Sequence, residues 1–132
     1  MRYLLDTNIL SELERHPRGP VAKRVLEVGQ EKVCTSIIVA AEIRYGLAKK
    51  RSPRLQHNLE MILDSLDILP FASPADKIYG SLRFSLEQAG KLIGPHDLLI
   101  AAQTLALGFT LVTDNYCNKD GFNPRMYEHD CT

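Results

Sequence analysis

Short apolar runs alternate along this chain with longer stretches in which an apolar residue recurs every three or four positions. The short runs have the length of β-strands, and they lie at residues 3–5, 32–35, 67–71 and 109–113, with an edge strand at 126–128. The stretches between them have the period of amphipathic helices. Strands that alternate with helices predict right-handed crossovers and an α/β fold, with a mainly parallel sheet of four to five strands flanked by helices.

Capping and stop residues set the ends of the predicted helices. Three serines, each followed at once or soon after by helical pattern, are placed as N-caps: Ser36, Ser52 and Ser73. Proline suits the first helical position and glycine the residue after the end. On these signals we expect helices over residues 8–16, 20–28, 37–50, 53–66 and 74–89, and a last helix from the turn at Gly94-Pro95 to Gly108.

Length and composition indicate one domain over residues 1–132, in a protein without a membrane association. The chain is 45% hydrophobic and 24% charged, which is ordinary for a globular protein. No apolar run reaches the roughly 20 residues that a membrane span needs. The first residues have no signal-peptide layout, and three unclustered cysteines favour free thiols in a reduced compartment. We therefore expect a cytoplasmic protein.

The net charge does not indicate a nucleic-acid partner, because the 16 basic and 16 acidic residues cancel. A local basic run is more informative, and it comprises Arg44, Lys49, Lys50, Arg51 and Arg54, with no acid inside it. Such a run is commonly a solvated helix end. It becomes a phosphate-binding patch if an active site lies beside it.

The first strand ends on an acid, in the segment Leu4-Leu5-Asp6-Thr7-Asn8. Its uninterrupted apolar run suits a strand that is covered on both faces of a parallel sheet. In open α/β sheets, ligands bind beyond the carboxyl ends of the strands, where Asp6 would lie. The alternative is that Asp6 or Asn8 only caps the following helix.

Other acidic residues occupy positions from which we expect them to lie near Asp6. Glu42 is expected on the inner face of its helix, with Ile38, Val39, Tyr45 and Gly46 as same-face neighbours. Asp97 lies in the first turn of the last helix, where an acid also simply complements the helix dipole. Asp114 and Asn115 follow the strand at 109–113. Carboxylates that converge repel one another, and hard divalent cations such as Mg²⁺ or Mn²⁺ relieve that repulsion.

Four segments together resemble the PIN-domain ribonucleases, and more narrowly the VapC-type toxins of type II toxin–antitoxin systems. They are Leu4-Leu5-Asp6-Thr7-Asn8, Ala41-Glu42-Ile43-Arg44-Tyr45-Gly46, Gly94-Pro95-His96-Asp97-Leu98-Leu99-Ile100-Ala101-Ala102 and Leu111-Val112-Thr113-Asp114-Asn115. The resemblance covers roughly residues 1–115 in the expected order. Relatives carry a different pattern after it, and residues 116–132 keep the length of that tail but little of its sequence.

The resemblance implies a Mg²⁺- or Mn²⁺-dependent endoribonuclease. Asp6, Glu42 and Asp97 would bind or position the ion, Asp114 or Asn115 would fill a fourth position, and Thr7, Asn8 and Thr113 would support them. It further implies cleavage of initiator tRNA in the anticodon stem-loop, a homodimer, and a hetero-oligomer with a VapB-type antitoxin. The basic residues Arg44, Lys49, Lys50 and Arg51 are the candidate RNA contacts.

Three other interpretations of the sequence are a phosphatase, a soft-metal site and a PIN-like domain that does not cleave RNA. An aspartate-nucleophile phosphatase would carry a second Asp where this chain has Asn8. Cys117, His129 and Cys131 are potential ligands of a soft metal, but their spacing fits no common zinc signature. A PIN-like domain with an altered tail could bind RNA or a partner without cleaving, although unused buried acids would only reduce stability.

Overall fold

The computed structural model describes residues 2–91, 93–113 and 126–128. Five strands form one sheet in the order β3-β2-β1-β4-β5, and every neighbouring pair is parallel. Their bounds are β1 (Tyr3–Leu5), β2 (Val33–Ser36), β3 (Asp67–Leu69), β4 (Thr110–Thr113) and β5 (Met126–Glu128). The predicted α/β fold with a parallel sheet is confirmed, including the edge strand at 126–128.

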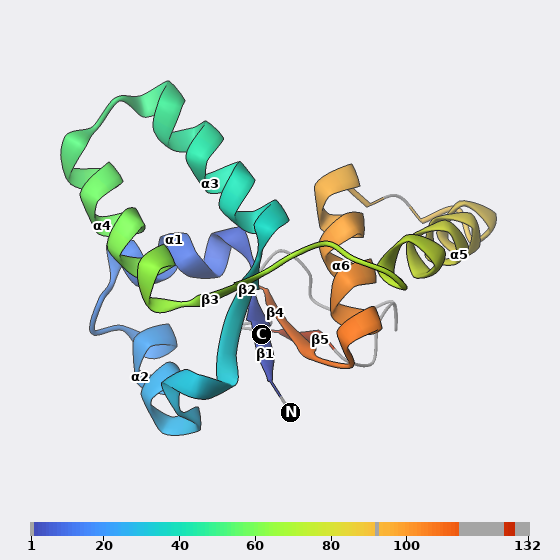
Figure 1. The fold of residues 1–132 in the computed structure, drawn as a ribbon, viewed down its shortest axis with the longest axis horizontal. Coiled ribbons are helices and arrows are strands. Elements are labelled where there is room, and N and C mark those ends of the chain that lie inside the picture. Colours follow the sequence, from blue (N-terminus) through green and yellow to red (C-terminus); the bar gives the residue numbers. More distant parts are fainter. Residues whose placement is uncertain (1, 92, 114–125, 129–132) are drawn as a thin grey trace.

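Among the described residues, six α-helices surround the sheet (Figure 1). Their bounds are α1 (Thr7–Arg15), α2 (Pro20–Val28), α3 (Ile37–Lys50), α4 (Pro53–Ser65), α5 (Ala75–Gln88) and α6 (Pro95–Leu107). Helices α1, α2 and α4 lie to one side of the strands and α6 lies to the other, where α5 packs against it. The chain therefore builds outward from β1 to β3 on one side and returns to β4 by way of α5 and α6.

Most predicted helix ends are confirmed by their caps. The hydroxyl of Ser36 accepts a hydrogen bond from the Ile38 N–H at 2.9 Å, and that of Ser52 accepts one from the Leu55 N–H at 3.2 Å. The prediction for Ser73 was wrong. Pro74 occupies the N-cap position of α5, its carbonyl accepts the bonds from Lys77 and Ile78, and no side chain caps this helix. The strand predicted from residue 32 begins at Val33, because residues 30–32 form a 3₁₀ turn.

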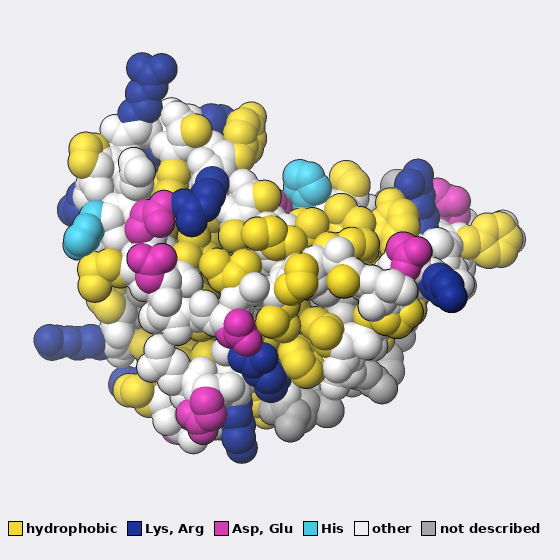
Figure 2. Space-filling view, in the orientation of Figure 1, with side chains coloured by type: hydrophobic (Ala, Val, Ile, Leu, Met, Phe, Trp, Pro, Cys, Tyr) yellow, Lys and Arg dark blue, Asp and Glu magenta, His cyan; other side chains and the backbone are white. Residues whose placement is uncertain are grey.

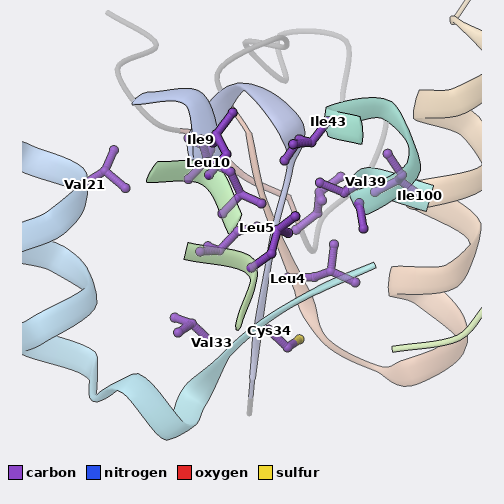
Figure 3. Close-up of a cluster of buried hydrophobic side chains, with 14 of the residues drawn as sticks. Leu4, Leu5, Ile9, Leu10, Val21, Val33, Cys34, Val39, Ile43 and Ile100 are labelled. Carbon is purple, nitrogen blue, oxygen red and sulfur yellow. The ribbon is translucent and has the colours of Figure 1, made fainter. Parts of the chain in front are cut away.

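The centre of the sheet is buried on both faces. Leu4 and Leu5 are adjacent in β1, so their side chains point to opposite faces, and both are buried. Figure 3 shows apolar side chains from the surrounding helices packed about them, among them Ile9, Val39 and Ile100. β1 is thus held in place from both sides, which fixes the position of the residue that follows it.

Within this core, the Cys34 thiol of β2 is buried and free, and burial raises its pKa to about 11. Cys117 and Cys131 lie outside the described residues, as does His129. In the part of the chain that is described, no helix is long and apolar enough to cross a membrane.

The outer surface has two lobes (Figure 2). Figure 2 shows Lys and Arg side chains at the tip of the α3–α4 hairpin, and hydrophobic side chains over the saddle between that hairpin and α5. The exposed aromatic residues include Tyr45 of α3 and Phe84 of α5.

The prediction that Glu42 lies on an apolar face of α3 is only partly right. Of its predicted neighbours, Val39 is buried, whereas Tyr45 is 66% exposed.

Candidate active site

Asp6 lies at the point where β1 ends and α1 begins. Its N–H donates to the Val112 carbonyl at 3.1 Å, which extends the β1–β4 pairing by one step. One carboxylate oxygen accepts from the Thr7 N–H at 2.5 Å, and the other accepts from the Thr113 hydroxyl at 2.7 Å. Asp6 is therefore the N-cap of α1, as the alternative interpretation held, and it also lies at the carboxyl edge of the sheet.

The electrostatics of Asp6 go beyond what a cap requires. The side chain is buried, and burial raises its pKa above the usual value of an aspartate. The hydrogen bonds from Thr113 and Thr7 lower the pKa, whereas the nearby carboxylates of Asp97 and Glu42 raise it further. Three acids from three separate elements are thus near enough to repel one another, which is the condition that a bound cation relieves.

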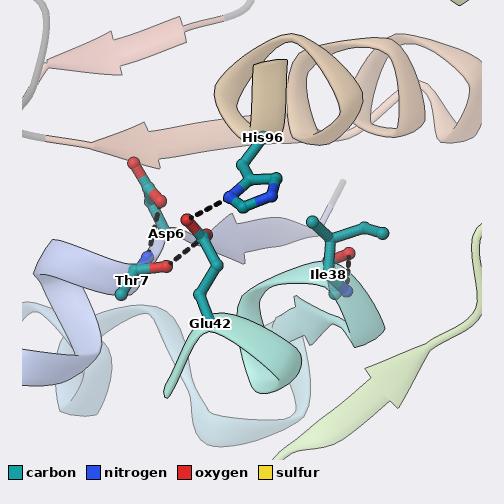
Figure 4. Close-up of polar contacts among 6 residues, drawn as sticks. Asp6, Thr7, Ile38, Glu42 and His96 are labelled. Carbon is teal, nitrogen blue, oxygen red and sulfur yellow. Dashed lines mark hydrogen bonds and ion pairs between the residues drawn. The ribbon is translucent and has the colours of Figure 1, made fainter. Parts of the chain in front are cut away.

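Glu42 reaches the site from α3 and is held at both carboxylate oxygens (Figure 4). Oε1 accepts from the Thr7 hydroxyl at 2.8 Å, and Oε2 lies 3.1 Å from Nδ1 of His96. Thr7 thereby joins the first two acids, with its N–H on Asp6 and its hydroxyl on Glu42. Asn8, the next residue of α1, is half-buried beside them.

His96 was not assigned a role by the sequence analysis, although it lies inside one of the four matching segments. It is exposed at the start of α6, directly before Asp97. Figure 4 shows its ring pointing from the start of α6 toward Glu42. The contact could have been suspected only from the position of a histidine next to a candidate metal ligand.

Asp97 is the third residue of α6 and lies in the first turn of that helix. A Cβ built at Gly94 would lie 3.3 Å from its Oδ2, so the glycine leaves room for the acid. The helix dipole favours a negative charge at this end. The carboxylate of Asp97 contributes to the raised pKa of Asp6, as expected of two acids that lie near each other.

Gln103 fixes α6 against the sheet and was missed by the sequence analysis. It is buried, its amide group donates to the carbonyls of Leu69 and Pro70 at 3.1 and 2.9 Å, and its oxygen accepts from the Ser36 hydroxyl. One side chain thus ties α6 to the ends of β2 and β3. The available signal was a pair of polar residues, Gln103 and Thr104, within the otherwise apolar stretch from Leu98 to Leu107.

The donor set fits a hard divalent cation. Mg²⁺ prefers carboxylate oxygens and commonly binds through one or two of them while it keeps several waters. Asp6 and Asp97 supply two such groups. Among the described residues, no three His, Cys, Asp or Glu side chains already surround one point as a metal site. Glu42 is turned to Thr7 and His96 instead, so two acids with waters are the simpler set.

The structure separates the candidate RNA-binding residues into different roles. Arg44 forms an ion pair with Glu60 of α4, and the Lys49 ammonium lies 4.7 Å from the centre of the Tyr45 ring. Lys50 lines a groove that also contains Thr7 and Glu42. Arg51 ends α3 in the left-handed backbone region, with a φ of 51°. Asp114 and Asn115, the candidates for the fourth position, lie outside the described residues.

Glu42→Gln isolates the charge of Glu42, because a glutamine keeps an oxygen for Thr7 and an amide for the His96 ring. We expect Mn²⁺ affinity, measured by calorimetry, to fall about tenfold or more, a size typical of groups that orient metal ligands, and RNA cleavage to fall with it. Glu60→Gln on α4 removes a charge outside the site and should change neither. Equal Mn²⁺ affinity in wild type and Glu42→Gln would remove Glu42 from the metal centre.

A family model, curated relatives and solved structures that resemble this chain all point to the same family. A model of the PIN domain matches residues 3–116. Ribonuclease VapC2 of Rickettsia felis is 39% identical over 117 residues, and the tRNA(fMet)-specific endonuclease VapC of Shigella flexneri is 30% identical over 118 residues; each match covers 87% of both chains. A chain in the crystal structure of VapBC2 from Rickettsia felis bound to a promoter DNA fragment superposes with a TM-score of 0.87 at 34% identity, over 98% of this chain and 100% of that one.

Proposed function

This chain belongs to the PIN-domain family of VapC ribonucleases, and we propose that it is the toxin of a VapBC-type pair, a divalent-metal endoribonuclease that cuts tRNA. The observation that supports the site most strongly is the buried Asp6, whose pKa is raised by burial and by two further carboxylates that reach it from α3 and α6. Such an arrangement reduces the stability of the empty protein, and a bound cation would relieve the repulsion between the carboxylates.

The residues divide the work of phosphodiester hydrolysis. Asp6 and Asp97 would hold Mg²⁺ or Mn²⁺, and when bound the ion lowers the pKa of a water and steadies negative charge on the phosphoryl oxygens. Thr113 and the Thr7 N–H fix both oxygens of Asp6, so its lone pairs point in set directions. Glu42, which Thr7 and His96 hold by its two carboxylate oxygens, would orient the attacking water and receive its proton.

The substrate is proposed from a relative. The Shigella flexneri protein is named as a tRNA(fMet)-specific endonuclease, and it matches 87% of this chain at 30% identity. On that ground we propose initiator tRNA, cut in its anticodon stem-loop, as the RNA that this chain cleaves. Loss of initiator tRNA would inhibit translation and make the free enzyme toxic.

The partners are proposed on the same basis. Solved relatives include VapBC complexes, and those from Rickettsia felis and Salmonella typhimurium are bound to DNA. We propose that this chain forms a homodimer and binds a VapB-type antitoxin that blocks the acidic site. The described residues leave Glu42 and His96 partly exposed, which is consistent with a site that a second chain can reach.

Mapping of RNA 5′ ends after expression of the chain alone in bacteria tests the substrate. We expect new ends within the anticodon stem-loop of initiator tRNA, because each cut leaves one new 5′ terminus, and Asp97→Asn expressed at the same level should produce none. New ends in other RNAs would keep the ribonuclease and replace its substrate. Growth inhibition without any new 5′ end would contradict the proposed function.

A further inference from the structure

A groove runs from the acidic site along α3, between that helix and helices α1 and α4. It begins at Thr7 and Glu42, continues past Gly46, and reaches Lys50, Arg54 and Arg15, which come from three different helices. The acid Glu14 also lines it, and its carboxylate accepts a hydrogen bond from the Asn58 amide at 3.2 Å. Its volume is about 570 Å³, within the range of about 300–1,000 Å³ that is usual for ligand sites. A groove that opens on the reacting groups at one end and on cations at the other is shaped for an extended anion.

The cations of this groove are available for a ligand. Lys50 and Arg54 are exposed, and in the ranges 2–91 and 93–113 neither side chain forms an ion pair or hydrogen bond. Within the described part of the chain, the Arg15 guanidinium forms an ion pair with Glu12 alone, one helical turn away at 3.2 Å. Exposed pairs of this kind contribute little to stability and exchange easily. By contrast, Arg44 and Lys49 of the same basic run are already engaged by Glu60 and Tyr45.

The cations lie beyond the reacting groups. Glu42 and Lys50 are eight residues apart on α3, which separates them by about 12 Å along the helix axis. A group that far away contacts the chain on one side of the bond that is cut, and not the bond itself. It would affect substrate binding without altering the hydrolysis step.

Gly46 provides a second, independent observation. It lies in the interior of α3, where glycine is disfavoured, and a Cβ built on it would meet no heavy atom within 4 Å. Packing therefore does not require a glycine at this position. Gly46 lies one turn after Glu42 and lines the groove, so the missing side chain keeps the groove open between the acids and the cations.

We infer that this groove, lined by Gly46, Arg15, Lys50 and Arg54, binds the phosphate backbone of a single-stranded RNA segment next to the bond that is cleaved. The inference rests on the proposed function, since it takes RNA as the substrate of the acidic site. It differs from the sequence-based expectation by adding Arg15 of α1 to Lys50 and Arg54 of the basic run. The other members of that run, Arg44, Lys49 and Arg51, are set aside.

The test measures binding of a labelled single-stranded RNA oligonucleotide of mixed sequence, in EDTA so that cleavage does not intervene. The variant replaces Arg15, Lys50 and Arg54 by Gln, and its matched control replaces Arg18, Lys23 and Lys77, three exposed cations elsewhere, in the same way. We expect the groove variant to bind about tenfold more weakly than the control, and its salt slope to fall by about 2, at about 0.7 per lost contact. Equal affinity and slope in the two variants would overturn the inference.

A steric variant tests the groove without changing any charge. Gly46→Leu should fill it and reduce RNA affinity about tenfold, whereas Gly80→Leu in α5, where a Cβ also meets nothing within 4 Å, should not. Both Gly→Ala changes should raise the melting temperature, which shows that each helix accepts a side chain. Wild-type RNA affinity in a folded Gly46→Leu would overturn the inference, and if that protein does not fold, the charge variants decide.

Cleavage distinguishes this inference from the proposed function. With Mg²⁺ and saturating RNA, the groove variant should cleave at close to the wild-type rate, because no acid of the site has changed, while its KM rises about tenfold. If wild type and groove variant cleave with the same KM, the groove inference fails and the ribonuclease remains. If wild type cleaves no RNA at all, the proposed function itself fails.

Discussion

Asp6→Asn and Asp97→Asn are each expected to lower RNA cleavage at least about a hundredfold while the fold stays intact. An amide is a much weaker ligand for Mg²⁺ than a carboxylate, and a bound ion contributes several kcal/mol of transition-state stabilisation, of which about 3 kcal/mol corresponds to that hundredfold. The change is small in shape at both positions, so lost activity reports on charge.

The fold should tolerate Asn at position 6 because Asn caps helices as well as Asp does. The amide oxygen can still accept the Thr7 N–H, and the amide nitrogen can donate to the Thr113 hydroxyl. The pKa of Asp6 is raised in the folded state, so its ionisation reduces stability as pH rises through that pKa, and Asn removes this effect. In EDTA at neutral pH, the melting temperature of Asp6→Asn should equal or exceed that of wild type.

RNA cleavage and thermal melts together separate the interpretations of Asp6 as a metal ligand and as a helix cap. If Asp6 were only the cap of α1, Asp6→Asn would cleave RNA as wild type does. If its charge stabilised the empty fold, the melting temperature in EDTA would fall clearly. Added Mn²⁺ should raise the melting temperature of wild type and raise that of Asp6→Asn much less, since binding to the native state stabilises it.

Gln103→Leu is expected to lower the free energy of unfolding by about 3 kcal/mol. Leucine has a similar volume but leaves the Ser36 hydroxyl and the Leu69 and Pro70 carbonyls without their partner, and a buried polar group left unpaired costs about 1–3 kcal/mol. For a domain of this size that loss is equivalent to a fall in melting temperature of about 10 °C.

The same change should loosen α6, which carries Asp97 and His96. We expect Mn²⁺ affinity to fall in the folded protein, measured by calorimetry at a temperature below the transition. Gln88→Leu at the exposed end of α5 is the matched control and should alter neither quantity. A Gln103→Leu protein as stable as wild type would show that the three bonds of Gln103 do not hold α6 to the sheet.

The sequence predicted the sheet and the meeting of strand ends because both follow from local patterns. An apolar run that stops on Asp6 and another that stops at Thr113 are visible in the sequence, and parallel pairing places such ends side by side. The caps at Ser36 and Ser52 were predictable for the same reason. At Ser73 the same signal failed, because Pro74 itself takes the N-cap position and α5 starts one residue later.

Contacts between elements were beyond sequence reasoning. The hydroxyl of Thr7 reaches Glu42 across 35 positions of the chain, and Gln103 reaches Ser36 across 67. Neither pairing leaves a periodic signal, since each depends on how α3 and α6 are set against β1 and β2. The basic run shows the same limit: only the fold divides Lys50, which lines the groove, from Arg44, which pairs with Glu60.

Cleavage of RNA by the purified chain, with and without a divalent ion, is the most direct test of the site built on Asp6, Glu42 and Asp97. Wild type is incubated with tRNA in EDTA and then with added Mg²⁺ or Mn²⁺, beside Asp97→Asn that has been purified identically. We expect specific fragments only from wild type and only with the ion present. Equal cleavage by wild type and Asp97→Asn, or full cleavage by wild type in EDTA, would contradict a metal-dependent ribonuclease centred on these three acids.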